Sequence, residues 1–118
     1  MIKKIIFKNI KFYNINTKNF DKFIIRKGLF VFPAGPALAS IEESSKYYNS
    51  LRKADYAFFD SGFFVLLLKV FKNISVSKFS GYKFLNLFFD YLKKNKKKSV
   101  FCIDPNPKYL RSNIHHLL

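Results

Sequence analysis

The sequence has no tryptophan, only seven acidic residues and a single cysteine, and the shortage of cysteine excludes two ways of stabilising a small chain. One thiol, Cys102, cannot form an internal disulfide. The only two histidines, His115 and His116, do not complete the ligand set of a structural zinc site. Neither disulfides nor zinc therefore hold the chain together, and we expect a reducing compartment.

The chain is rich in hydrophobic and aromatic side chains. Among its 118 residues 49% are hydrophobic and 19% are aromatic, including sixteen phenylalanines. An intrinsically disordered chain is far less apolar. The length suits one domain with a real core, and we expect a single domain over residues 1–118, with a basic segment at 1–27 before the main part at 28–118.

Positive charge is the second excess. Twenty-two basic residues face seven acidic ones, which gives a net charge of +15. Such a charge favours an anionic membrane surface or another polyanion as partner, although AT-rich coding alone would also enrich lysine. Only three residues are arginine, so sequence-specific nucleic-acid binding is weakly supported. The lysines cluster at 1–27 and 69–98, while residues 28–68 carry four acidic and three basic side chains.

The hydrophobic runs are too short or too interrupted to direct the chain into or across a membrane. Lysines break up residues 1–12 before the apolar region of a secretion signal can form. Residues 56–71 are interrupted by Asp60 and Lys69 and fall short of the roughly 20 residues of a spanning helix. We expect a cytoplasmic protein, with a peripheral position on the inner face of the cell membrane as an option.

Short β-branched and aromatic runs predict the strands. We expect strands at residues 2–7, 10–15, 29–32, 56–59 and 99–103, of which the last three would be buried on both faces. The segment at 10–15 is either the hairpin partner of the first strand or its continuation.

Helical periodicity and helix-start signals predict the helices between these strands. The first helix begins at Pro36 or at Ser40, where Ser40 to Glu43 matches a capping box, and its apolar positions continue to Leu51. Residues 63–71 are apolar nearly all round, which predicts a helix buried in the core. A further helix follows Ser80 and Gly81, with the lysine run 93–98, interrupted by Asn95, at its C-terminal end. An amphipathic helix from residue 109 to 117 would close the chain.

The alternation of strands and helices predicts an α/β fold, a Rossmann-like and mostly parallel sheet with helices on both faces. Ligands bind such sheets beyond the carboxyl ends of the strands. Residues 33–36, 60–62 and 104–106 lie at these ends.

Asp60 is the leading catalytic candidate because it follows a strand and has phenylalanine neighbours. Apolar surroundings would make its carboxylate a better general base. The alternative is structural: Asp60 caps the helix that follows, assisted by Ser61.

The other polar features have structural alternatives as well. Ser80 and Gly81 would present a helix N-terminus to a phosphate, or they form an ordinary capped turn. The histidine pair is more typical of an exposed chain end than of a metal site. Cys102 is expected to pack inside its strand. No dinucleotide or P-loop motif is present.

Three blocks of sequence together resemble the WecG/TagA/CpsF glycosyltransferases, the N-acetylmannosaminyltransferase-type family. They are Val31-Phe32-Pro33-Ala34-Gly35-Pro36, then Ala54-Asp55-Tyr56-Ala57-Phe58-Phe59-Asp60-Ser61-Gly62, then Phe79-Ser80-Gly81-Tyr82-Lys83-Phe84-Leu85. Their order and spacing agree with the family over about residues 28–118.

The resemblance implies inverting transfer of an N-acetylhexosamine, such as N-acetylmannosamine, from a UDP-sugar to a polyprenyl-diphosphate-linked acceptor. The reaction would belong to surface polysaccharide synthesis at the cytoplasmic membrane face and would need no metal or other cofactor. Asp60 matches the family's proposed catalytic base. By the same comparison Ser61, Gly62, Ser80 and Gly81 line the substrate cleft.

The chain departs from the family pattern at several positions. Phe32 and Ala34 stand where the family has threonine and asparagine, and Phe64 replaces a glycine. The segment Asp104-Pro105-Asn106-Pro107 replaces a glycine-rich turn, and family members are about twice as long. The shorter length predicts an incomplete domain. The many apolar residues of the chain further predict that it associates with itself or with a partner such as a missing C-terminal half.

Two other functions fit the sequence. One is a noncatalytic basic module that binds anionic membrane or nucleic acid through the lysines of 1–27 and 69–98, with nucleic acid the less favoured ligand. The other is an inactive remnant of the enzyme.

Overall fold

The computed structural model describes residues 2–96, 99–101, 103 and 106–109. The chain divides into two compact units, Met1–Leu85 and Asn86–Leu118, and the boundary falls within helix α5 (Gly81–Lys94). The basic segment 1–27 does not stand apart from the first unit, because it supplies two strands of that unit's sheet.

The chain begins with a β-hairpin of β1 (Lys3–Phe7) and β2 (Ile10–Asn14), which pair antiparallel. The two turn residues, Lys8 and Asn9, have φ values of 46° and 61°. Two positive φ values in a two-residue loop are typical of the turn that matches the twist of a hairpin. The hairpin alternative for residues 10–15 is therefore confirmed.

The hairpin extends into a mostly parallel sheet through β2. The sheet order is β1-β2-β4-β3, where β3 is Phe30–Val31 and β4 is Tyr56–Phe58. Strand β4 pairs parallel with β2 on one side and with β3 on the other, and Ala57 lies opposite both Phe12 and Val31. The predicted Rossmann-like α/β class is confirmed, with β1 as the antiparallel edge strand.

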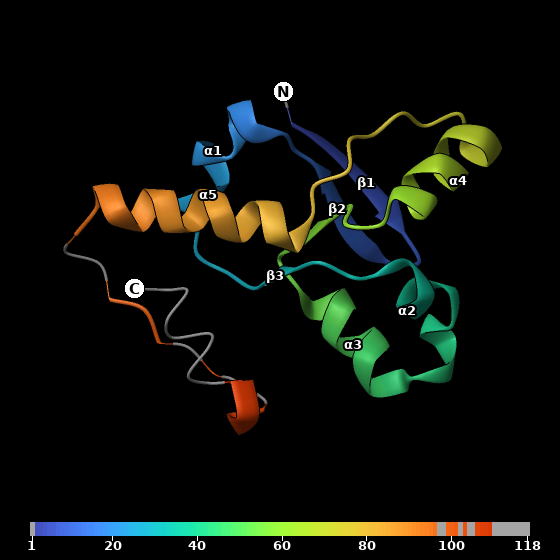
Figure 1. Cartoon of the computed structure of the whole chain (residues 1–118). Coiled ribbons are helices and arrows are strands. Elements are labelled where there is room, and N and C mark those ends of the chain that lie inside the picture. The colour runs from blue at the N-terminus through green and yellow to red at the C-terminus, as the bar shows by residue number, and fades with distance from the viewer. Residues whose placement is uncertain (1, 97–98, 102, 104–105, 110–118) are drawn as a thin grey trace. The chain divides into compact units, whose positions relative to one another are not determined.

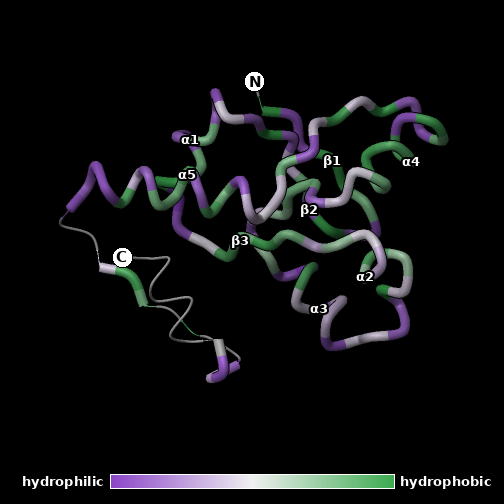
Figure 2. The backbone as a smooth tube through the Cα atoms, viewed as in Figure 1, coloured by the Kyte–Doolittle hydropathy of each residue, from purple (hydrophilic) through white to green (hydrophobic). Residues whose placement is uncertain are grey.

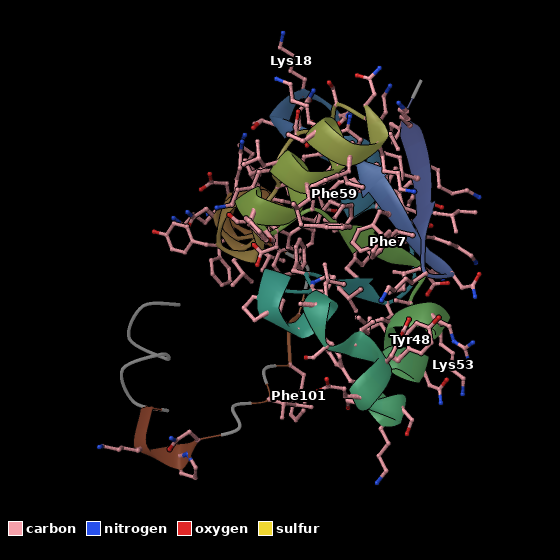
Figure 3. The ribbon with its side chains drawn as sticks, turned by 90° about the vertical axis from the view of Figure 1, so that its right-hand side faces the viewer. Phe7, Lys18, Tyr48, Lys53, Phe59 and Phe101 are labelled. Carbon is pink, nitrogen blue, oxygen red and sulfur yellow. The ribbon has the colours of Figure 1, made fainter. Side chains whose placement is uncertain are left out.

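One face of the sheet is covered by α2 (Gly35–Ala39), α3 (Ser45–Lys53) and α4 (Gly62–Lys72). Phe12 is central to this face and lies 4.9 Å from Phe59 and 5.6 Å from Phe64 between ring centroids. Figure 3 shows Phe59 and Phe7 between α4 and the strands, and the Phe7 ring lies 4.9 Å from that of Phe64. The buried residues of this core are Ile5, Ile10, Phe12, Leu38, Ile41, Leu51, Ala57, Phe59, Phe64 and Leu68.

The opposite face of the sheet is an aromatic cluster covered by α1 (Asp21–Ile24) and the first turn of α5 (Figure 1). Phe58 is fully buried there, with its ring 5.6 Å from Phe23 and 6.3 Å from Phe84. Phe23 meets it edge to face, an arrangement that aromatic pairs favour. Neighbouring residues of β4 thus face opposite cores, which is the period-two pattern of a strand buried on both sides.

The segment after β3 is not the continuous helix that its periodicity predicts. It forms α2, a 3₁₀ turn at Ile41–Glu43 and then α3. The helix start at Pro36 is confirmed, because this proline lies in the first turn of α2. The capping box at Ser40 is wrong: the Ser40 side chain makes no cap hydrogen bond and donates instead to the carbonyl oxygen of Pro36, 3.3 Å away.

Helix α4 forms where it was predicted, but the expectation that it is buried all round is wrong. Only Phe64 and Leu68 of this helix are buried. Figure 2 shows that hydrophobic residues dominate α4, yet much of that surface faces solvent. A single layer of helices covers this side of the sheet, so α4 has a core on one side only.

The second unit contains the rest of α5, which ends at Lys94, and a 3₁₀ turn at Pro107–Tyr109. Residues 99–101 and 103 form no strand, and Phe101 and Ile103 are 88% and 84% exposed. The predicted buried strand at 99–103 is therefore wrong for these residues: an apolar run of this length needs a neighbouring strand to pair with, and none pairs with it in the described chain. Cys102, Asp104, Pro105, both histidines and most of the predicted last helix lie outside the described residues.

Candidate functional site

The site lies where the chain leaves the carboxyl end of β4. Asp60 comes two residues after this strand and is half-buried. Its backbone N–H donates to the carbonyl oxygen of Phe58, and the N–H of Phe79 donates to that of Phe59 over 2.7 Å. The second bond brings the segment before α5 alongside Asp60, although the two are about twenty residues apart in the chain.

The Asp60 carboxylate is held by the N-terminus of α5. Its Oδ1 accepts a hydrogen bond of 3.0 Å from the backbone N–H of Gly81, and the Ser80 hydroxyl accepts one of 3.1 Å from that of Lys83. A helix N-terminus carries N–H groups without partners in the helix, and the Asp60 carboxylate satisfies one of them at the start of α5.

The capping alternative proposed from sequence needs a correction. Ser61 caps α4, since its hydroxyl accepts from the N–H of Phe64 over 3.2 Å. Asp60 does not assist that helix and instead contacts a different one, α5. The sequence could not distinguish these possibilities because both residues are good capping types and lie next to each other.

Two glycines allow the other loops to approach this point. A Cβ on Gly35, at the start of α2, would lie 2.5 Å from the Ser61 hydroxyl oxygen. One on Gly81 would lie 3.4 Å from the Phe32 ring. The turn after β3, the turn after β4 and the start of α5 therefore meet beside Asp60.

All five residues predicted for the site gather here: Asp60, Ser61, Gly62, Ser80 and Gly81. Gly62 is the exposed first residue of α4, and the two serines are half-buried. Each serine hydroxyl accepts one bond from its helix and keeps its own proton to donate. Gly81 already binds the Asp60 carboxylate, so this N–H is not available to a phosphate.

Two lysines missed by the sequence reasoning border the site. The Lys78 side chain passes Gly62, with its Cδ 3.8 Å from where a Cβ would stand. Lys83 lies in the first turn of α5, with its Nζ 5.5 Å from the centroid of the Phe79 ring. Lys78 belongs to no motif, and Lys83 lies in the third block of the resemblance but was not singled out there. Both stand in a lysine-rich region, which gave no reason to choose them.

The arrangement supplies a base beside hydroxyl and cationic groups. Oδ2 of Asp60 makes no hydrogen bond or ion pair to another described residue. One oxygen is thus fixed by α5, while the other can accept a proton from a bound hydroxyl group. Lys78 and Lys83 place positive charge at the border, where a phosphate-bearing substrate would be attracted.

Asp55 lies in one of the blocks that carry the resemblance, and in the structure it has a structural role. Its Oδ2 accepts a 2.8 Å hydrogen bond from the N–H of Leu29, at the opposite end of β4 from Asp60. The Leu29 carbonyl oxygen in turn accepts from the N–H groups of Asp55 and Tyr56. Asp55 therefore fixes the start of β3 beside β4.

Two of the residues that depart from the family pattern, Phe32 and Phe64, pack against other aromatic side chains in the interior. The Phe32 ring lies 5.1 Å from Phe58 and 5.0 Å from Phe84. Phe64 is 7% exposed and packs on Phe12. Both positions thus contribute apolar packing in this chain, and neither offers a polar group to a ligand.

Over residues 2–96 and the short described segments beyond them, no three metal-ligating side chains come together. No helix in the same residues is both long and apolar enough to cross a membrane. Comparison of the chain with protein-family models, with curated proteins and with solved structures found no match.

Proposed function

We propose that the protein is a glycosyltransferase in which Asp60 is the catalytic base. The observation that carries the proposal is the Asp60 carboxylate at the carboxyl end of a central parallel strand, with one oxygen held by α5 and the other without a hydrogen bond to any described residue. Open parallel sheets bind ligands at this edge. The resemblance of the surrounding blocks to the WecG/TagA/CpsF family supports glycosyl transfer as the reaction.

In the proposed reaction, Oδ2 of Asp60 accepts the proton of the acceptor hydroxyl. At the same time the oxygen of that hydroxyl attacks the anomeric carbon of the donor sugar. The bond from that carbon to the diphosphate breaks as the new glycosidic bond forms, and UDP leaves with the bonding electrons. Attack from the face opposite the leaving group inverts the anomeric centre. Lys78 and Lys83 would offset the negative charge of the diphosphate.

The substrates follow from the same resemblance. The donor is a UDP-N-acetylhexosamine, and the acceptor is a polyprenyl-diphosphate-linked sugar at an anionic membrane face, in surface polysaccharide synthesis. The lysine-rich composition of the chain supports partners that carry phosphate.

The Asp60→Asn variant tests the proposal without removing the contact to α5. An asparagine side-chain oxygen can still accept from the N–H of Gly81, but the amide is not a base. With labelled UDP-N-acetylmannosamine or UDP-N-acetylglucosamine and a polyprenyl-diphosphate-linked N-acetylglucosamine acceptor, we expect the wild-type chain to transfer the sugar. Asp60→Asn should lower kcat by about 100-fold or more.

Asp90→Asn is the matched control, because it makes the same change at an exposed position of α5. It should leave transfer unchanged. Equal rates for Asp60→Asn and wild type would show that Asp60 is only a capping residue. Absence of transfer in the wild-type chain, together with vesicle binding that falls with salt, would favour the noncatalytic basic module.

A further inference from the structure

Helix α4 exposes a large apolar face that the other described residues of the first unit do not cover. The side chains of Phe63, Leu66, Val70 and Phe71 are 68%, 55%, 66% and 77% exposed. Isolated exposed apolar residues are common in proteins, but four on one eleven-residue helix form a patch of the kind that marks an interaction site.

The spacing places three of these side chains away from the core, while Phe71 lies seven residues after the buried Phe64 and is exposed because it stands in the last turn of the helix. Phe63, Leu66 and Val70 follow i, i+3 and i+7, which is one face of a helix. Phe64 and Leu68, the two buried residues of α4, lie on the opposite face. We call Phe63, Leu66, Val70 and Phe71 the α4 apolar face.

An apolar hollow of about 260 Å³ adjoins this face. Phe63 and Phe71 of the α4 apolar face line it, together with Leu38 of α2 and Phe7 of β1. Lys8 and Lys72 also border the hollow. An apolar surface next to ammonium groups fits an amphiphile that combines hydrocarbon with negative charge.

The charge around α4 is positive and partly unpaired. Lys69 and Lys72 lie in the last turn of the helix, α4 contains no acidic residue, and neither lysine forms an ion pair within the described chain. Lys8 forms a 3.1 Å ion pair with Glu42, so the negative charge of Glu42 is balanced by Lys8. Free cations beside an apolar face are the pattern of helices that lie in the plane of a membrane interface.

We propose that α4 docks the protein on an anionic bilayer, with the α4 apolar face among the acyl chains and Lys69 and Lys72 at the level of the lipid phosphates. A second copy of the chain fits this surface less well, because each copy carries a net charge of +15 and two such faces would bring like charges together. The inference rests on the proposed function in one respect: that function places the protein at an anionic membrane face, and α4 is the surface that would meet this membrane.

Tryptophan fluorescence measures this insertion directly, because the natural chain has no tryptophan. The Phe63→Trp variant carries its only indole on the α4 apolar face. On vesicles of equal parts phosphatidylglycerol and phosphatidylcholine, we expect a blue shift of its emission and quenching by brominated acyl chains. Unchanged emission on these vesicles would overturn the proposal.

Paired variants of the unlabelled chain separate the apolar and charge contributions. Phe63→Ser combined with Val70→Ser should weaken vesicle affinity by about tenfold or more, since two apolar side chains no longer leave water. Ile25→Ser removes a side chain that is 73% exposed next to α1, across the sheet, and should change nothing. Lys69→Gln with Lys72→Gln should reduce affinity and its salt dependence more than Lys46→Gln with Lys53→Gln on α3.

Other results would overturn the proposal. Equal vesicle affinity of wild type and the Phe63→Ser/Val70→Ser variant would exclude α4 as the docking surface. A wild-type dimer in gel filtration that this variant dissociates would assign the face to a second copy. The proposed reaction is tested separately: Asp60→Asn should bind vesicles like wild type, and the α4 variants should still transfer sugar to a water-soluble acceptor.

Discussion

At the scale of single residues, Asp60 has two separable roles. Its hydrogen bond to the N–H of Gly81 stabilises the start of α5, and its second oxygen is available for chemistry. Asp60→Ala removes both, so we expect it to lower the free energy of unfolding by about 1 kcal/mol, as the loss of a helix cap does. Asp60→Asn should lower it by less. Urea unfolding of the two variants measures the difference, and equal losses would contradict the capping role.

Gly28 is a second residue whose replacement has a defined cost. Its φ is +145°, and a Cβ there would lie 2.7 Å from Oδ2 of Asp55, the atom that accepts from the N–H of Leu29. We expect Gly28→Ala to destabilise the fold by about 1–3 kcal/mol.

Gly62→Ala is the matched control for Gly28→Ala. Its Cβ would make only an ordinary contact with the flexible side chain of Lys78, and alanine is the better helix former at the start of α4. Thermal unfolding should show a stability equal to or above that of wild type. A loss at position 62 as large as that at position 28 would contradict this reading of the two glycines.

At the scale of elements, α4 combines a buried and an exposed face of similar composition. Leu68 is 4% exposed and belongs to the core, whereas Leu66 is 55% exposed. We expect Leu68→Ala to cost about 2–5 kcal/mol of unfolding free energy and Leu66→Ala to change it by less than about 0.5 kcal/mol. Denaturant titration of both variants without lipid checks this, and similar losses would mean that the exposed face packs in solution.

The strands of the first unit could be predicted from the sequence because their apolar runs are short and clearly bounded. The position of Asp60 followed directly, since it comes just after the run that forms β4. That Asp60 lies beside Ser80 and Gly81 could not be predicted from local sequence patterns. It depends on the backbone hydrogen bond between Phe79 and Phe59, which no local pattern records.

The wrong predictions have two physical causes. Residues 63–71 and 99–103 are apolar, but composition does not say whether a neighbouring element exists to bury them. The pattern at Ser40 matches a capping box, yet its hydroxyl bonds backward to Pro36 because α2 ends at Ala39. Local sequence thus specified element types better than it specified burial or helix boundaries.

At the scale of the whole molecule, the net charge of +15 opposes compactness. Repulsion among like charges destabilises a folded chain, and salt screens it. We therefore expect the melting temperature to rise by at least about 2 °C between low salt and 0.5 M NaCl.

A charge-reduced variant is the control for this salt effect. Lys4 and Lys11 are exposed on the hairpin, and replacing both with glutamine should raise stability at low salt and reduce the further gain from NaCl. A melting temperature that falls with salt in the wild-type chain would mean that favourable charge pairs outweigh the repulsion.

The sheet order also has a consequence for how the protein emerges from the ribosome. Strand β4 lies between β2 and β3, so both of its neighbours are synthesised before it. The hairpin can close early, but the inner edge of β2 must wait through about forty residues of translation, a delay on the order of seconds. During this interval the nascent chain presents an unpaired strand edge that carries the aromatic side chains of Phe12 and Tyr13, which is the kind of segment that chaperones bind.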